Sequence, residues 1–273
     1  MKAGVCYGVI DEGHTFEEKL AAAHSSGYEG IELVLGIDRA DPLSLGLDSE
    51  SLFAVRRTVE RAQLEIPSVM GGPALAQTPL LSFDPGVRQR SVGNYALALE
   101  TVATLGASTV LMHPGQLRAE TRYDQAWEWV VQALRDLVPA CERTGVSIGL
   151  ENVWNKFLLS PREFAQLLDE VNHPLIGCYL DTANMLLYGY AEQWVEIIGR
   201  RIKKVHVKDF KRERGGGRFC QLLSGDCNFP RVMAELRAVR YDDYLTSEVS
   251  PSERSDGETM RDTAERIREI TLL

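Results

Sequence analysis

Four residues whose side chains bind divalent metals in many proteins stand at the ends of short apolar segments. The segments are SIGLE, IGCYLD, IKKVHVKD and YLTSE, and the residues are Glu151, Asp181, His206 and Glu248. Carboxylate oxygens with one imidazole nitrogen form a hard, oxygen-rich donor set, which favours Mn²⁺, Mg²⁺ or Co²⁺ over a thiolate-bound structural zinc. If the segments are neighbouring strands of a parallel barrel, the sequence predicts one divalent metal ion, Mn²⁺ first, with Zn²⁺ also compatible.

This interpretation depends on the set of four rather than on any one member. A single Asp or Glu at a strand end is more often a helix cap or a solvated loop residue than a ligand. Here each residue lies within or directly after an apolar run, where an ionised group is costly unless it has a partner. Four such residues at consecutive strand ends therefore favour a functional site over four separate structural roles.

Short β-branched runs alternate with segments of helical periodicity along the chain. The predicted strands are AGVCYGVI, GIELVL, EIPSVMG, STVLMHPG, SIGLENV, IGCYLDTA, KKVHVKDF and YLTSEV. The predicted helices span residues 15–26, 51–63, 87–105, 123–143, 160–171, 192–201, 229–239 and 259–273. In the fourth of these, Val130, Leu134 and Leu137 follow the spacing of one buried helix face.

Eight β–α alternations without a change in composition predict an α/β fold, a (β/α)₈ TIM barrel, with residues 1–273 as a single domain. An open doubly wound sheet is the alternative, because strand order cannot be read from a sequence. The glycine-rich dinucleotide fingerprint is missing after the first strand. Barrel active sites gather at the carboxyl ends of the strands, where the four residues lie. The one irregular stretch, residues 211–229, is expected to be a mobile active-site loop.

Composition narrows the classes of partner. The 273 residues carry a net charge of -9 and give a pI near 5.2, which disfavours a nucleic-acid partner because such a partner needs a basic face. No stretch approaches the ~18 apolar residues of a membrane span, and the first residues lack the apolar core of a signal peptide. The 5 cysteines show no CxxC spacing, which is typical of free thiols in a reducing compartment. We therefore expect a cytoplasmic protein without a membrane partner.

The segments GLENVWN, YLDTANM, VHVKDF and TSEV resemble the xylose isomerase-like TIM barrel superfamily, and most closely its ketose 3-epimerase and sugar-phosphate isomerase/epimerase branch. The resemblance implies that Glu151, Asp181, His206 and Glu248 bind the metal. It also implies that Glu151 and Glu248 act as catalytic acid and base, transferring a proton beside the carbonyl of a small ketose or ketose phosphate through a metal-stabilised enediolate. Relatives of this fold pair or form tetramers, so a homodimer or homotetramer is expected.

Further residues near the predicted strand ends are candidates for substrate binding. His113, which ends STVLMH, is expected to bind substrate or a ligating carboxylate, with a structural histidine as the alternative. Lys208 is expected at the barrel mouth, where it orients Asp181 or the substrate. Arg212 lies six residues after His206, where the ketose epimerases carry a substrate-binding arginine; a solvated loop arginine is the alternative.

The sequence departs from parts of the superfamily in ways that affect its function. Asn184, which we assign to substrate binding, stands where AP endonucleases and several free-ketose epimerases have histidine. The segment GDCN at 225–228 lacks the Asp-x-His pair of the endonucleases. The chain therefore lacks ligands for a three-metal cluster, and a DNA endonuclease is disfavoured. A dehydratase of the inosose or dehydroshikimate type remains the alternative, because it needs the same glutamates.

Two other features complete the predicted site. Glu32, in the second predicted strand, either supports the floor of the site or binds His113, with a structural ion pair as the alternative. Trp154 and Phe157, which follow the fifth strand, are expected to line an apolar wall.

Overall fold

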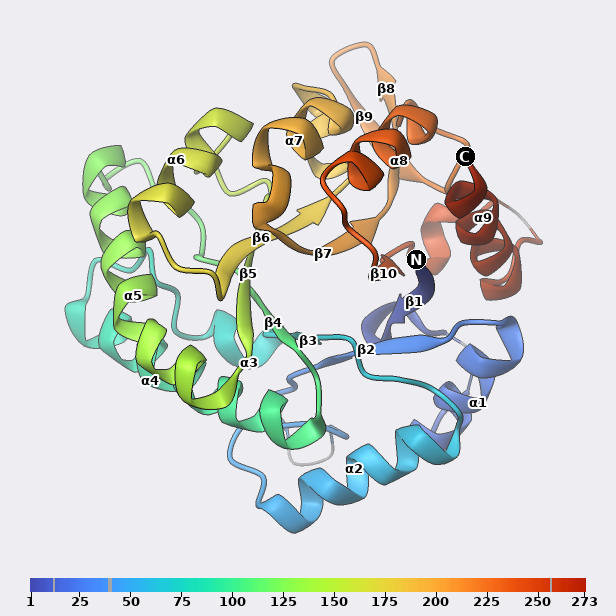
Figure 1. Ribbon diagram of the computed structural model, residues 1–273, viewed down its shortest axis with the longest axis horizontal. Helices are drawn as coiled ribbons and strands as arrows, with labels where there is room; N and C mark the ends of the chain where they lie inside the picture. Colours follow the sequence, from blue (N-terminus) through green and yellow to red (C-terminus); the bar gives the residue numbers. More distant parts are fainter. Residues whose placement is uncertain (12, 39–40, 256) are drawn as a thin grey trace.

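A closed barrel of parallel strands forms the centre of the molecule (Figure 1). The computed structural model describes residues 1–11, 13–38, 41–255 and 257–273. Within these residues the barrel has eight strands: β1 (Lys2–Cys6), β2 (Gly30–Val34), β3 (Val69–Met70), β4 (Thr109–Met112), β5 (Ser147–Glu151), β6 (Ile176–Asp181), β7 (Ile202–Val207) and β10 (Tyr244–Ser247). They follow the order β1-β10-β7-β6-β5-β4-β3-β2, and pairing of β1 with β10 closes the ring.

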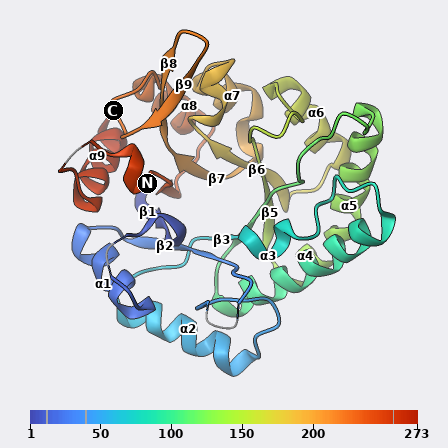
Figure 2. The same ribbon diagram turned by 180° about the vertical axis from the view of Figure 1, so that it is seen from behind.

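Helices surround the barrel, and along the chain each barrel strand is followed by a helix (Figures 1 and 2). The outer helices are α1 (Phe16–Ser26), α2 (Ser49–Arg61), α4 (Pro85–Leu105), α5 (Tyr123–Thr144), α6 (Pro161–Val171), α7 (Ala191–Ile198), α8 (Phe229–Ala238) and α9 (Met260–Leu272). The predicted single-domain TIM barrel is confirmed. The open-sheet alternative is wrong, because β1 and β10 are hydrogen-bonded neighbours.

Local sequence signals explain where the helices begin and end. Ser160 accepts a hydrogen bond from the backbone N–H of Glu163, and Pro161 occupies the first turn of α6, where its missing N–H is not needed. At the C-terminal end of the preceding helix, α5, Gly145 adopts a left-handed conformation with φ of 70°. That conformation suits a residue without Cβ and lets the chain turn directly into β5.

The hydrophobic core lies between the helices and the outer face of the barrel. The inner face of α5 contributes Val130, Leu134 and Leu137, each fully buried, as the helical spacing predicts. The interior of the barrel is more polar, because the buried side chains of Glu32, Tyr179 and His206 meet there. Among the described residues, no helix is both long and apolar enough to cross a membrane.

A short helix and a hairpin add to the barrel at its carboxyl end. The helix, α3 (Gly72–Ala76), follows β3 and was not predicted. The hairpin consists of β8 (Asp209–Glu213) and β9 (Gly216–Cys220), and it projects beyond the ring of helices beside α7 and α8 (Figures 1 and 2). The prediction of an irregular loop over 211–229 is therefore wrong for residues 211–220, whereas residues 221–228 form turns without a helix or strand. The glycines of the hairpin make a tight antiparallel turn, in which Gly215 has φ of 87°.

Candidate functional site

The four predicted ligands converge at the carboxyl ends of four neighbouring strands. Glu151 and Asp181 end β5 and β6, His206 is the penultimate residue of β7, and Glu248 follows β10. Asp181 is directly paired with His206 in the register of β6 and β7. One donor atom from each of the four residues lies within 4.8 Å of the others. Three carboxylates and an imidazole at this separation are a suitable donor set for one divalent cation.

Asp181 provides an independent test of whether the site fits a cation. Its Oδ1 accepts hydrogen bonds from the backbone N–H groups of Ala183 and Asn184, both at 2.7 Å. Its Oδ2 is buried and has no hydrogen-bond partner among the described residues. Burial raises the pKa of Asp181 to about 7, against the opposing charge of Lys208. Because an unpartnered buried carboxylate oxygen is costly, the geometry fits a cation held at Oδ2.

His206 is fixed by polar groups inside the barrel. Its Nε2 lies 2.7 Å from Oε1 of Glu32, and both side chains are fully buried. The other oxygen of Glu32 accepts hydrogen bonds from Tyr179 Oη and from Ser68 Oγ, the latter at 2.8 Å. Burial disfavours the charged imidazole, yet the nearby Glu32 carboxylate raises the pKa of His206 well above its usual range. Glu32 therefore supports the floor of the site by binding His206, and it does not bind His113.

The orientation of His206 leaves its other nitrogen directed at the site. Nδ1 lies 3.3 Å from Oε1 of Glu151 and 3.7 Å from Oε2 of Glu248. A histidine that donates one N–H to a carboxylate presents the other nitrogen as a ligand. Tyr179 packs its ring 4.5 Å from the imidazole and so also restricts its rotation.

Glu151 is bound by two histidines. His113 Nε2 lies 3.2 Å from Oε2 of Glu151, while His206 Nδ1 faces Oε1. Although burial opposes ionisation, these two contacts lower the pKa of Glu151 to about 2. The side chain of His113 is half-exposed, so it reaches both the carboxylate and the space above it. This contact matches the second of the two roles predicted for His113.

Lys208 places an ammonium group beside the carboxylates of the site. Its Nζ lies 3.2 Å from Oε2 of Glu248 and 4.3 Å from the centre of the Phe219 ring. Burial tends to neutralise this amine, but the charges of Asp181 and Glu248 outweigh burial and raise its pKa above the usual value. A charged Lys208 therefore offsets part of the negative charge of the site and restricts Glu248.

A cavity of about 230 Å³ opens above the four residues, between β3, β4, β5 and β10. Glu151 and Glu248 line it together with His113, Tyr95 and Leu75. The other two members of the cluster, Asp181 and His206, are fully buried and do not line it. The site therefore has a buried pair of side chains below and a pair of glutamates that reach the cavity.

Three of the residues assigned to substrate binding, Asn184, Lys208 and Arg212, do not line this cavity. The amide of Asn184 donates to the backbone oxygen of Asn152 at 2.9 Å, and Asn184 does not line the described cavities. Arg212, on β8, is half-exposed, and its Nε lies 3.7 Å from Asp226 Oδ2. Its guanidinium also stacks on Tyr190 at 5.5 Å. These contacts give Asn184 and Arg212 structural partners, and their roles toward substrate remain predictions.

The aromatic residues after β5 have different environments. Trp154 is exposed and stacks on Phe219 at 5.0 Å, and its Nε1 donates to the backbone oxygen of Asn184 at 2.6 Å. Phe157 is buried and packs against Tyr123 at 5.1 Å. Of these two residues, therefore, Trp154 is the one that reaches the surface, where it shares Phe219 as a neighbour with Lys208.

Some residues that shape the site were not predicted. Asn152 clamps Asp181 by accepting from its backbone N–H at 2.8 Å and donating to its backbone oxygen at 3.0 Å. Tyr179 and Ser68 bind Glu32 inside the barrel. The sequence does contain one signal for Tyr179. It stands two residues before Asp181, and a strand places residues two apart on the same face.

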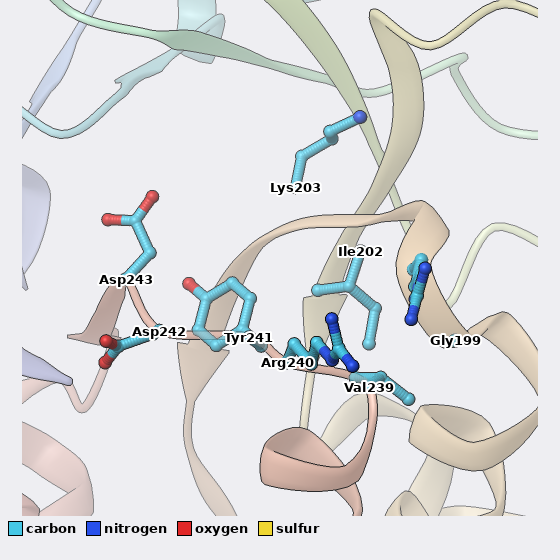
Figure 3. A pocket seen from close by; sticks show the side chains of 9 residues that line it. Gly199, Ile202, Lys203, Val239, Arg240, Tyr241, Asp242 and Asp243 are labelled. Atoms are coloured by element: carbon cyan, nitrogen blue, oxygen red, sulfur yellow. The ribbon is translucent and has the colours of Figure 1, made fainter.

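A different cavity, of about 420 Å³, lies at the opposite end of the barrel (Figure 3). Its walls come from the start of β7 and from the segment between α8 and β10, including Lys203, Arg240 and Tyr241. Asp242 and Asp243 in its lining pair with the N-terminal amine of Met1 and with Lys204. This is the amino end of the strands, where residues of a TIM barrel serve stability rather than catalysis.

Comparisons with known proteins agree with this architecture. The family model of the xylose isomerase-like TIM barrel matches residues 20–270. None of the curated protein sequences matches the chain. Among solved structures, a 3-keto-D-glucoside 4-epimerase from E. coli has a TM-score of 0.79 at 16% identity and covers 100% of both chains.

Two more solved structures have similar values. A D-psicose 3-epimerase crystallised in the presence of D-fructose has a TM-score of 0.78 at 16% identity, covering 100% of this chain and 97% of its own. The IOLI protein with a bound zinc atom has a TM-score of 0.77 at 15% identity, with the same coverage. At these identities the likeness shows the fold alone.

Proposed function

The chain belongs to the xylose isomerase-like TIM barrel family, and on that premise we propose that it is a divalent-metal-dependent sugar isomerase or 3-epimerase. Its substrate would be a small ketose or a ketose phosphate. The main support for this proposal is that the four residues of the cluster occupy two different positions. Glu151 and Glu248 line one cavity, whereas Asp181 and His206 lie buried beneath it. The solved epimerases of similar fold support the same class of reaction.

Glu151, Asp181, His206 and Glu248 would hold the metal, with Mn²⁺ as the first choice and Mg²⁺, Co²⁺ or Zn²⁺ as alternatives. When bound, the ion would supply positive charge that stabilises the enediolate formed from the substrate. The unpartnered Oδ2 of Asp181 supports this assignment. The zinc atom in the structure of the IOLI protein is consistent with a divalent ion in this fold.

The two glutamates would move the proton. One carboxylate removes the proton from the carbon beside the carbonyl, and the other returns a proton to the opposite face of the same carbon. Return to the neighbouring carbon instead gives the aldose–ketose isomerisation. Both side chains reach the same cavity from separate strands, β5 and β10, as such a pair requires.

The other residues assigned to the substrate would bind and orient it, and of these His113 lines the cavity. His113 holds Glu151 and is half-exposed toward the cavity, so its imidazole can meet a substrate hydroxyl. Lys208 offsets the charge of Glu248 beside it. Arg212 would have to leave Asp226 to bind a phosphate, and Asn184 would have to leave Asn152.

We also propose a cellular compartment and an assembly for this protein. Cys6, Cys141, Cys178, Cys220 and Cys227 are all free thiols. Free thiols fit the reducing cytoplasm expected from the sequence. A homodimer or homotetramer is proposed on the family resemblance alone.

Product analysis in D₂O tests the proposal. The protein loaded with Mn²⁺ is incubated with a panel of ketoses, ketose phosphates and inososes and followed by NMR. Deuterium at the carbon beside the carbonyl, with inverted configuration, is the result expected for an epimerase, and deuterium with a new aldehyde is expected for an isomerase. Loss of water would instead identify a dehydratase. Absence of exchange with every compound, in a protein that binds no divalent metal, would contradict the proposal.

A further inference from the structure

A second cavity adjoins the one above the four clustered residues. It has a volume of about 510 Å³, against about 230 Å³ for the first. His113 and Ala76 line both cavities, so the side chain that contacts Glu151 also forms part of the boundary between them. A molecule bound at the glutamates therefore has room to continue past His113 into a space about twice as large.

The walls of this second cavity are held together by backbone and side-chain hydrogen bonds. The backbone N–H of Leu81 donates to the oxygen of Pro114 at 3.0 Å, which joins the segment before α4 to the segment after β4. Asn155 Nδ2 donates to the oxygen of Gly115 at 3.0 Å, and Asn155 accepts at its own backbone oxygen from Leu117 at 2.9 Å. These hydrogen bonds connect the segments that form the walls of the cavity.

An exposed aromatic ring forms one side of the cavity. Phe83 is 51% exposed, although large apolar side chains are usually buried. It is held in place by an edge contact with Trp129 at 6.0 Å, and Arg88 donates to the backbone oxygens of Ser82 at 2.7 Å and Phe83 at 3.1 Å. The negative face of an aromatic ring suits the C–H face of a sugar.

The polar groups of the cavity suit hydroxyl groups better than a phosphate. Arg118 has no ion pair or hydrogen bond from its side chain to the rest of the described chain, so its donors are available to a ligand. Asp84 lines the same cavity and would repel an anion, while its carboxylate accepts from a hydroxyl. Gln116 adds an amide that both donates and accepts. Donors and acceptors beside an aromatic ring match a neutral polyol.

We propose that the substrate is a ketose that carries a second sugar ring, with the keto sugar between Glu151 and Glu248 and the second ring in the cavity lined by Phe83 and Arg118. This inference rests on the proposed function and extends its substrate from a small ketose to a ketose that carries a glycosyl group. A monosaccharide would occupy only the smaller cavity, whereas a glycosylated ketose occupies both. Recognition by the larger cavity is then the main determinant of specificity.

Two readouts test this inference separately from the proposed function. The first compares deuterium exchange in the Mn²⁺-loaded protein for D-fructose, fructose 6-phosphate and the hexosyl-fructoses lactulose, leucrose and isomaltulose. The second measures binding of the same compounds by saturation-transfer NMR, which needs no turnover. At least one hexosyl-fructose should exchange with a kcat/KM about 10-fold or more above that of fructose, as expected for one additional ring contact.

Variants of the larger cavity test whether the preference for a hexosyl-fructose arises there. Phe83→Ala and Arg118→Ala should each lower kcat/KM and binding for the preferred hexosyl-fructose by about 10-fold, and change the values for fructose by less than about twofold. Phe53→Ala is the matched control, because Phe53 is a 45% exposed phenylalanine on α2, away from both cavities. This variant should leave kcat/KM and binding unchanged for both fructose and the hexosyl-fructose.

The outcomes separate the two claims. Exchange of fructose or its phosphate with no hexosyl-fructose exchanging faster would overturn the inference while leaving the proposed function intact. Equal losses for fructose and hexosyl-fructose in Phe83→Ala would also overturn it. If none of these compounds exchanges and the wider panel of ketoses, ketose phosphates and inososes does not either, the proposed function fails. Binding of a hexosyl-fructose that depends on Phe83 would still support the sugar site. If no compound exchanges and no hexosyl-fructose binds in this way, both the proposed function and the second sugar site are contradicted.

Discussion

The carboxylate of Glu32 lies 2.7 Å from Nε2 of His206, and both side chains are completely buried. The two residues come from strands on different sides of the barrel, β2 and β7, and meet in its interior. This contact selects the ring nitrogen that faces Glu151. Since the second partner of a metal-binding histidine controls its tautomer and orientation, Glu32 is a positioning residue for the proposed metal.

Replacing Glu32 with Gln should weaken metal binding by roughly 10- to 100-fold, the range found for such partners of metal-binding histidines. The neutral amide no longer favours the Nε2–H tautomer by its charge. The measurement is a competition titration of Mn²⁺ against a chelator, which does not depend on turnover. Thermal unfolding in the presence of chelator checks that the variant is folded.

Glu50→Gln is the control for this experiment, because Glu50 is an exposed carboxylate at the start of α2. It removes the same charge without touching His206, and Mn²⁺ affinity should stay unchanged. An Mn²⁺ affinity of Glu32→Gln equal to that of Glu50→Gln would mean that Glu32 has only a structural role.

Asp181→Asn should separate stability from metal binding. In chelator, the neutral amide relieves a buried charge that lies near Glu151, so the variant should be more stable than the wild type by about 0.5–2 kcal/mol. With Mn²⁺ at about 100 times the wild-type dissociation constant, the wild type should gain about 2.7 kcal/mol and the variant far less. Denaturant unfolding with and without Mn²⁺ measures both effects. A variant that is less stable in chelator and still gains fully from Mn²⁺ would contradict the assignment of Asp181 as a ligand.

Lys208→Met should change metal affinity and turnover in opposite directions. Without the ammonium beside Glu248, the carboxylates attract a cation more strongly, and Mn²⁺ should bind roughly 3- to 10-fold tighter. Turnover should fall, because Glu248 loses the partner that restricts it. Lys211→Met serves as the control, since Lys211 lies on the hairpin and pairs with Asp226 instead of Glu248. Weaker Mn²⁺ binding in Lys208→Met would show that this lysine does not act by charge compensation.

The barrel and the cluster of four residues could be predicted from the sequence because their signals are local. Each strand reads as a short apolar run, and each candidate ligand stands at its end, so the fold alone brings Asp181 beside His206. The helix boundaries follow from caps such as Ser160 and Gly145. No knowledge of distant contacts is needed for these features.

The rest depends on contacts that a sequence does not reveal. Glu32 and His206 are 174 positions apart, and only closure of the barrel shows that Glu32 meets His206 rather than His113. The glycines after β8 are compatible with a loop or with a hairpin, and pairing with β9 decides between them. The larger cavity depends on how the segments around Leu81 and Pro114 are joined, which no periodicity predicts.

The central claim is that Glu151 and Glu248 transfer a proton beside a sugar carbonyl. The most direct test is deuterium exchange into a turned-over ketose by Glu151→Gln and Glu248→Gln, with the bound metal of each variant measured in the same samples. Each variant should lose at least ~10²-fold of the wild-type rate, even when supplied with saturating Mn²⁺. Exchange at a near-normal rate in either variant would contradict the account.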